Sequence, residues 1–152
     1  PNDIVMNGKK VCGILTEMAL EQTTIDYVVI GVGINVNQSI FDTEIATIAT
    51  SIALELGRKI TRTELIGRIL HYFEKEYAEF AKTYDLGSLM ERYNGYLLNR
   101  DTQVRVLDPK GEYEGFALGI NSQGELMVKR QNGEIEAVYA GEVSVRGIYG
   151  YV

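Results

Sequence analysis

The stretch Asn7-Gly-Lys-Lys-Val-Cys-Gly-Ile-Leu15 decides how the first part of the chain folds. Asparagine followed by glycine suits the positive φ angles of a tight turn, so residues 4–15 are predicted to form a β-hairpin. Residues 16–25 are interpreted as a polar connection. The apolar run Tyr27–Val36 then predicts a strand that is buried on both faces.

Glycines recur in both of these strands, at Gly13, Gly31 and Gly33. A strand position without a side chain lets a ligand or another backbone approach closely. Lys10 stands at the edge of this region, where a fixed ammonium group could meet a negative charge that develops during a reaction. We therefore take Lys10 and the glycine-lined gap as the candidate site.

The composition limits the class of protein. With 152 residues the chain can form one ordinary domain or two small ones, and 45% hydrophobic with 24% charged residues indicates a globular protein. A net charge of -6 argues against wrapping nucleic acid. The single cysteine, Cys12, excludes an internal disulfide and fits a reducing compartment. No apolar run approaches the roughly 20 residues of a membrane span, so we expect a cytoplasmic protein.

The middle of the chain predicts helices that serve as scaffold. Asp42 precedes an apolar stripe of helical period that ends at Gly57, a natural C-terminal cap. Two capping boxes follow, one beginning at Thr61 and one at Ser88, and each predicts the start of a helix. The second of these helices is expected to end near Leu97.

After Asn99 the sequence changes to short strand candidates separated by turn signals. The candidates are Thr102–Leu107, Tyr113–Ile120, Glu125–Lys129, Glu134–Val138 and Glu142–Arg146. Five short strands in this length predict a small closed barrel of SH3 or OB type. The predicted fold is α+β: a mixed sheet with packed helices in residues 1–98, followed by a small SH3-like β-barrel in residues 99–152.

A dinucleotide-binding site is the first alternative that Gly31-x-Gly33 suggests. It is rejected because Val36 stands where the third glycine belongs and no helix opens directly afterwards. His71 has no metal-ligand partner at a suitable spacing and is interpreted as a helix-surface residue.

Several short motifs, taken in order, resemble the catalytic domain of biotin protein ligases. They are Pro1-Asn-Asp3, Lys10-x-x-Gly-Ile-Leu15 and Gly31-x-Gly-Ile-Asn35. Near the end, Ala140-Gly-Glu-Val-Ser-Val-Arg146 is similar to the C-terminal signature of the same family. Each motif is modest by itself, but their order and spacing together are specific.

The resemblance implies a reaction. The family makes biotinyl-5'-AMP from biotin and ATP with Mg²⁺, and then transfers biotin to a lysine of the biotin carboxyl carrier protein of acetyl-CoA carboxylase. Lys10 occupies the position whose ammonium lies beside the biotin carboxyl and the α-phosphate. A cation there would stabilise the charge that builds up on the phosphate oxygens.

The resemblance also implies roles for other residues. The biotin-binding set is Lys10, Gly13, Leu15, Gly31 and Gly33. The ATP-binding set is Asn2, Asn35, Glu142 and Arg146, with Asn35 reading the adenine edge. Asp3 joins Lys10 as a catalytic residue and is the expected Mg²⁺ ligand.

The chain is expected to be the C-terminal part of such an enzyme, because the family's arginine-glycine phosphate loop would lie upstream of it. It is therefore expected to be inactive alone. The partners expected are the carrier protein, the upstream half of the same enzyme and a second copy; DNA is expected only if a helix-turn-helix domain precedes the chain. Two alternatives stay open: a non-catalytic module that binds a carrier protein or a subunit, and a lipoate-ligase-like acyltransferase.

Overall fold

The computed structural model describes residues 2–108, 111–139 and 144–147, with side chains described in the first two ranges. Two compact units are present, Pro1–Ile66 and Gly67–Val152. No helix in the described ranges is long and apolar enough to cross a membrane.

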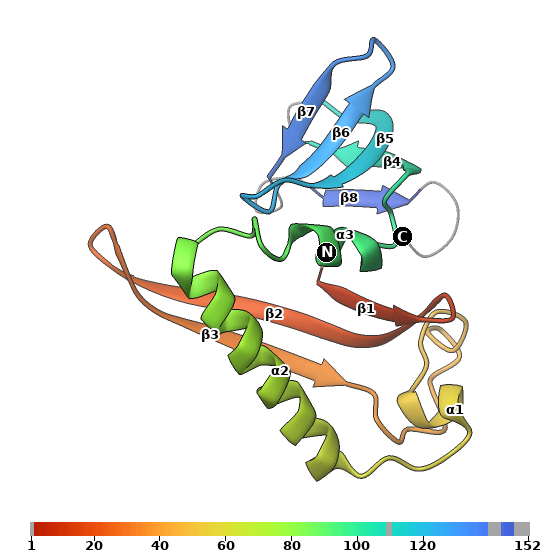
Figure 1. Ribbon diagram of the computed structural model, residues 1–152. Helices are drawn as coiled ribbons and strands as arrows, with labels where there is room; N and C mark the ends of the chain where they lie inside the picture. The colour runs from red at the N-terminus through yellow and green to blue at the C-terminus, as the bar shows by residue number, and fades with distance from the viewer. Residues whose placement is uncertain (1, 109–110, 140–143, 148–152) are drawn as a thin grey trace. The chain divides into compact units, whose positions relative to one another are not determined.

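The first unit contains an antiparallel sheet with the order β1-β2-β3 (Figure 1). Its strands are β1 (Asp3–Met6), β2 (Lys9–Glu21) and β3 (Thr24–Ile34). The predicted turn is confirmed, because Asn7 has φ +48° and Gly8 has φ +76°. The expected mixed sheet is wrong: the strand pairs of the described residues are antiparallel, and the parallel pairing of Lys10 with Ala49 is an isolated bridge.

The polar connection predicted for residues 16–25 is wrong. This segment forms the far end of a long hairpin, and Gln22, with φ +56°, lies in its turn. The backbone pairing of β2 with β3 continues from Cys12 to Glu21 and outweighs the local polarity of the sequence. Burial of β3 on both faces is also wrong, because residues 24–33 are all exposed.

The first predicted helix is much shorter than expected. Helix α1 spans Ile52–Leu56, and residues 44–48 form turns instead. Ser51 is the N-cap, with its hydroxyl accepting a hydrogen bond from the Leu54 amide at 3.2 Å. The C-terminal cap at Gly57 is confirmed by its φ of +66°. The apolar stripe after Asp42 thus predicted a helix where the chain makes tight turns.

Two further helices follow, α2 (Arg62–Thr83) and α3 (Met90–Tyr96). The capping box at Thr61 correctly predicts the start of α2. The box at Ser88 is wrong as a cap, because Leu89 is the N-cap of α3 and makes no side-chain capping bond. The Leu89 amide instead donates to the Leu86 carbonyl at 3.0 Å, so the chain enters α3 through a turn.

The second unit contains a five-stranded antiparallel sheet with the order β7-β6-β5-β4-β8. Its strands are β4 (Thr102–Leu107), β5 (Tyr113–Ile120), β6 (Leu126–Arg130), β7 (Ile135–Val138) and β8 (Ser144–Gly147). Their inward-facing small residues form a core of Val104, Val106, Ala117, Val128 and Val138. All five predicted strands are therefore present, but no closed barrel is detected in the described residues.

A buried asparagine joins α3 to β5. The side chain of Asn94 donates to the Ile120 carbonyl at 3.1 Å and accepts from the Ile120 amide at 2.7 Å. The neighbouring Gly119 has φ +120°, and a Cβ there would lie 2.7 Å from the Asn94 Oδ1. Glycine is thus required both by the backbone conformation and by the space that Asn94 occupies.

Candidate functional site

The candidate site begins at a β-bulge in the pairing of β1 with β2. The paired residues are Val5 with Lys10 and Ile4 with Cys12. Val11 is therefore an extra residue on the β2 side, and an extra residue reverses the alternation of side chains along a strand. Lys10 consequently lies on the same face as Gly13, although a spacing of three would put them on opposite faces of a regular strand.

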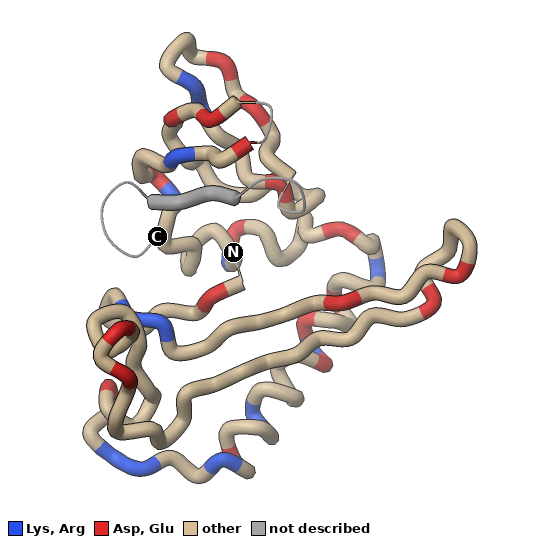
Figure 2. Tube along the Cα trace, turned by 180° about the vertical axis from the view of Figure 1, so that it is seen from behind, with Lys and Arg blue, Asp and Glu red and all other residues tan. Residues whose placement is uncertain are grey.

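The glycines extend this face across the sheet. Gly13 pairs with Gly33, and Leu15 pairs with Gly31. Side chains two residues apart share a face, so these four positions lie together on the face that carries Lys10. The strands are uncharged here: the segment between Lys10 and Glu17 and the segment following Asp26 are tan in Figure 2. The structure therefore brings the predicted biotin set onto one face.

Packing within this unit does not explain why positions 31 and 33 are glycines. A Cβ at either position would make only ordinary contacts, 3.7 Å from the Leu15 carbonyl oxygen and 3.8 Å from the Gly13 carbonyl oxygen respectively. Both residues lie in exposed strand without a positive φ angle. Their lack of a side chain thus leaves open surface beside Lys10, which suits the wall of a ligand site.

Gly13 has a different neighbour. A Cβ at this position would lie 3.3 Å from both Cε and Nζ of Lys10. The Lys10 ammonium makes an ion pair with Asp3, with 2.6 Å between Nζ and Oδ1. Gly13 therefore provides the space in which the lysine side chain reaches across to β1.

The Lys10 backbone is held by a segment far away in sequence. Its amide donates to the Ile48 carbonyl at 2.7 Å, and its carbonyl accepts from the Thr50 amide at 2.9 Å. The same segment holds the end of β3, since the Ile52 amide donates to the Asn35 carbonyl at 2.9 Å. Residues 48–52 thus connect Lys10, expected beside the biotin carboxyl and the α-phosphate, to Asn35, expected at the adenine edge.

The remaining predicted ATP-binding residues are Asn2, Glu142 and Arg146. Asn2 is exposed, and its backbone carbonyl accepts from the Ile14 amide at 2.8 Å. Glu142 lies outside the described residues. The Arg146 backbone belongs to β8 and pairs with Arg105, while its side chain is outside the description.

Sequence reasoning did not single out Thr50 and Glu55 as parts of this site. The Glu55 carboxylate accepts hydrogen bonds from the Thr50 hydroxyl and from the Asn7 side-chain amide, each at 2.5 Å. These two hydrogen bonds, in that order, hold the pKa of the Glu55 carboxyl below its usual value. Asn7 and Glu55 are far apart along the chain, so no local motif could have identified their contact.

Cys12 faces the other way. Its side chain is buried, and burial raises the pKa of its thiol, which Lys10 partly offsets. A raised thiol pKa disfavours the nucleophilic thiolate. Cys12 is thus a packed thiol rather than a candidate nucleophile.

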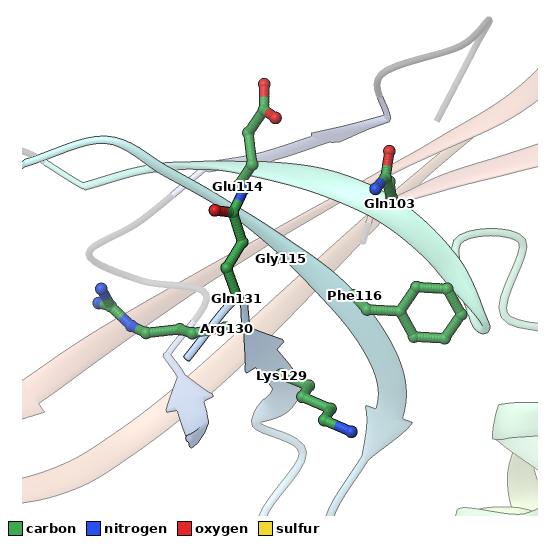
Figure 3. Close-up of a pocket in the computed structure, with 7 residues that line it drawn as sticks. All are labelled: Gln103, Glu114, Gly115, Phe116, Lys129, Arg130 and Gln131. Carbon is green, nitrogen blue, oxygen red and sulfur yellow. The ribbon is translucent and has the colours of Figure 1, made fainter. Parts of the chain in front are cut away.

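A cleft of about 190 Å³ lies elsewhere, on the outer surface of β4, β5 and β6 (Figure 3). Its labelled side chains point away from one another rather than toward a common point. The guanidinium of Arg130 is already engaged, because it pairs with Glu136 at 2.5 Å and lies 3.6 Å from the centre of the Tyr113 ring. This cleft lacks the convergent polar groups of a small-molecule site.

The side chains present fit a metal ion only in part. No group of three or more potential ligand residues occurs in the described part of the chain. Asp3 is the single carboxylate expected to bind the metal ion, and it is paired with Lys10. Mg²⁺ commonly uses one or two carboxylates together with substrate phosphates, so Asp3 could contribute only one ligand of several.

Comparison with protein families gives two matches. Residues 1–35 match the model of the biotin/lipoate A/B protein ligase family, and residues 101–146 match that of the biotin protein ligase C terminal domain. Among curated proteins, the bifunctional ligase/repressor BirA of Bacillus spizizenii is 40% identical, with 95% of this chain and 45% of that protein covered. The biotin--[acetyl-CoA-carboxylase] ligase of Mycobacterium tuberculosis is 33% identical, with 94% and 50% covered.

Solved structures give the same result. The biotin protein ligase from Aquifex aeolicus superimposes with a TM-score of 0.83 at 27% identity, covering 97% of this chain and 63% of that one. Its complex with biotin and ATP gives a TM-score of 0.82 at 26% identity, covering 97% and 60%. The chain spans about half the length of the curated relatives it matches.

Proposed function

The chain belongs to the biotin protein ligase family, and on that premise we propose that it forms the lysine-bearing part of a site that activates biotin. Residues 1–35 correspond to the end of the catalytic domain and residues 101–146 to the C-terminal domain. The observation that carries the proposal is the single sheet face shared by Lys10 and the glycines.

The proposed reaction has two steps. A biotin carboxylate oxygen attacks the α-phosphorus of ATP, and pyrophosphate leaves to give biotinyl-5'-AMP. The amine of a carrier-protein lysine then attacks the biotinyl carbonyl, an amide bond forms, and AMP and a proton leave. A fixed cation lowers the activation barrier of both steps, because negative charge on the phosphate oxygens increases in each transition state.

The residues of the shared face have distinct parts in this reaction. Gly31 and Gly33 leave open backbone against which the flat ureido ring system of biotin can lie, with Leu15 beside it. Lys10 lies at the end of that surface, where the biotin carboxylate would meet ATP. Asn35 follows β3, and its backbone amide donates to the Val11 carbonyl at 2.9 Å, so its side-chain amide is the group assigned to the nucleotide. Asn2, Glu142 and Arg146 complete the proposed ATP-binding set.

Asp3 is assigned two contributions. Its ion pair with Lys10 holds the ammonium in place, and it is the proposed protein ligand of the Mg²⁺ that ATP brings with its phosphates. Mg²⁺ supplies charge neutralisation on those phosphates when it is bound. The proposed partner is the biotin carboxyl carrier protein of acetyl-CoA carboxylase.

The proposed domain division is 1–98 and 99–152, with a small SH3-like barrel in the second part. The change from helices to short strands after α3 supports it, as does the start of the C-terminal family match at residue 101. Both features favour a boundary between α3 and β4.

The test uses the protein expressed from the whole open reading frame that contains this chain. We expect exchange of pyrophosphate with ATP to depend on biotin, and an apo carrier domain to gain one biotin by mass spectrometry. The 152-residue chain alone is expected to do neither. Exchange that depends on lipoate and not on biotin would favour the lipoate-ligase alternative, and exchange with neither acid would refute the proposal.

A further inference from the structure

Lys10 lies at an edge of the sheet where two different segments meet. On one side it faces β1, and on the other its backbone hydrogen bonds run to Ile48 and Thr50. A bulged strand start has an interrupted ladder, so the position of its backbone depends strongly on what pairs with it from outside. Segment 48–50 therefore fixes the position of the Lys10 backbone, from which its side chain extends.

Thr50 is the central residue of this arrangement. It is 3% exposed, its amide donates to the Lys10 carbonyl, and its hydroxyl donates to a Glu55 oxygen at 2.5 Å. A buried hydroxyl costs free energy unless it is hydrogen-bonded, so Glu55 determines how Thr50 is oriented.

Glu55 also contacts the turn that precedes β2. Its second oxygen accepts from the Asn7 side-chain amide at 2.5 Å. Asn7 belongs to the turn that leads into β2 and has φ +48°. One carboxylate on α1 thus links the turn that precedes Lys10 to the segment that pairs with it.

We propose that Glu55 is a positioning residue for Lys10, acting through Thr50 and Asn7 and touching no substrate itself. The inference rests on the proposed function of Lys10. Loss of the Glu55 carboxylate lets segment 48–50 and the Asn7 turn move independently, and the ammonium then loses its fixed place beside the reacting groups. Catalysis is sensitive to such displacements even when substrate binding is little changed.

The first test is hydrogen exchange on the 152-residue chain, which needs no activity. In Glu55→Ala we expect the amides of Lys10 and Thr50 to exchange about tenfold faster or more, while amides of β4 and β5 keep their rates. Glu79→Ala is the matched control, because Glu79 is also a carboxylate with a hydrogen-bonded neighbour, Lys82, but lies on α2. Unchanged exchange at both amides would overturn the inference, whatever the protein catalyses.

The second test measures kinetics in the protein from the whole open reading frame. We expect Glu55→Ala to lower kcat for biotin-dependent pyrophosphate exchange by roughly 10- to 100-fold, with KM for biotin changed by less than about threefold. A kcat within twofold of the unsubstituted protein would overturn the inference. If the unsubstituted protein itself shows no exchange, the proposed function fails, and the amide measurement still decides whether Glu55 holds Lys10.

A rescue variant separates positioning from simple loss of stability. Glu55→Gln keeps an oxygen for Thr50 and presents an amide donor to Asn7, which can accept it only by turning its own side-chain amide over, so we expect a smaller loss than in Glu55→Ala. Adding Asn7→Asp reverses both partners of that hydrogen bond, and aspartate tolerates the positive φ angle. We expect the double variant to recover slow amide exchange and most of kcat. A double variant no better than Glu55→Ala would count against the hydrogen-bonded link.

Discussion

Replacing Lys10 with methionine tests the candidate site most directly, because the change removes the charge and keeps most of the side-chain volume. The ion pair with Asp3 has 2.6 Å between Nζ and Oδ1, with side chains 39% and 28% exposed. An ion pair with this much exposure contributes up to about 1 kcal/mol to folding. We therefore expect urea unfolding of Lys10→Met to differ from that of the unsubstituted chain by no more than about that amount.

The effect on activity should be far larger. Removing one fixed donor that stabilises transition-state charge typically lowers the rate about 10²- to 10³-fold, or roughly 2.7–4 kcal/mol. The assay is biotin-dependent exchange of pyrophosphate with ATP by the protein from the whole open reading frame. A large loss of rate with a small loss of stability would locate the contribution of Lys10 in the reaction rather than in the fold.

Lys9→Met is the matched control. Lys9 pairs with Met6, so it lies on the opposite face of the sheet from Lys10. We expect Lys9→Met to keep at least half of the exchange rate. The reasoning would be refuted if Lys10→Met kept its rate within about threefold, or if Lys9→Met lost as much rate as Lys10→Met.

Three further predictions concern stability and reactivity of the 152-residue chain. Asn94→Ala leaves the buried amide and carbonyl of Ile120 without their partners, so we expect urea unfolding to show a loss of roughly 2–4 kcal/mol, whereas Asn132→Ala in an exposed turn should lose less than about 1 kcal/mol. Gly67→Ala should stabilise α2 by about 0.5–1 kcal/mol in the same assay, because a Cβ there meets nothing within 4 Å; a loss would contradict this. Because burial raises the pKa of the Cys12 thiol, alkylation by iodoacetamide at pH 8 should be slow in the folded chain and fast in urea, and equal rates would contradict the placement of Cys12.

Much of the secondary structure could be predicted because its signals are local. The Asn7-Gly8 turn, the cap at Gly57 and the short strands after Asn99 all depend on residues close to one another. The prediction failed where pairing between distant segments dominates. Residues 16–25 were interpreted as a polar connection but form the far end of a long hairpin, since pairing between β2 and β3 satisfies the backbone groups that face each other across it.

Some residues of the candidate site could likewise be found from the sequence, and others could not. Lys10 and the glycines stand out in the sequence because strand glycines and a lysine after a turn are locally visible. Thr50 and Glu55 do not, because their contacts join residues separated by tens of positions.

The sequence by itself determined that Lys10 and the glycines could form this site, and the family to which the chain belongs, because residue types and their order are properties of the chain. Only the tertiary structure decided that these residues share a face. Lys10 and Gly13 are three residues apart, and a regular strand would separate them. The bulge at Val11 turns the lysine to the side of the glycines, and a bulge exists only through pairing with β1.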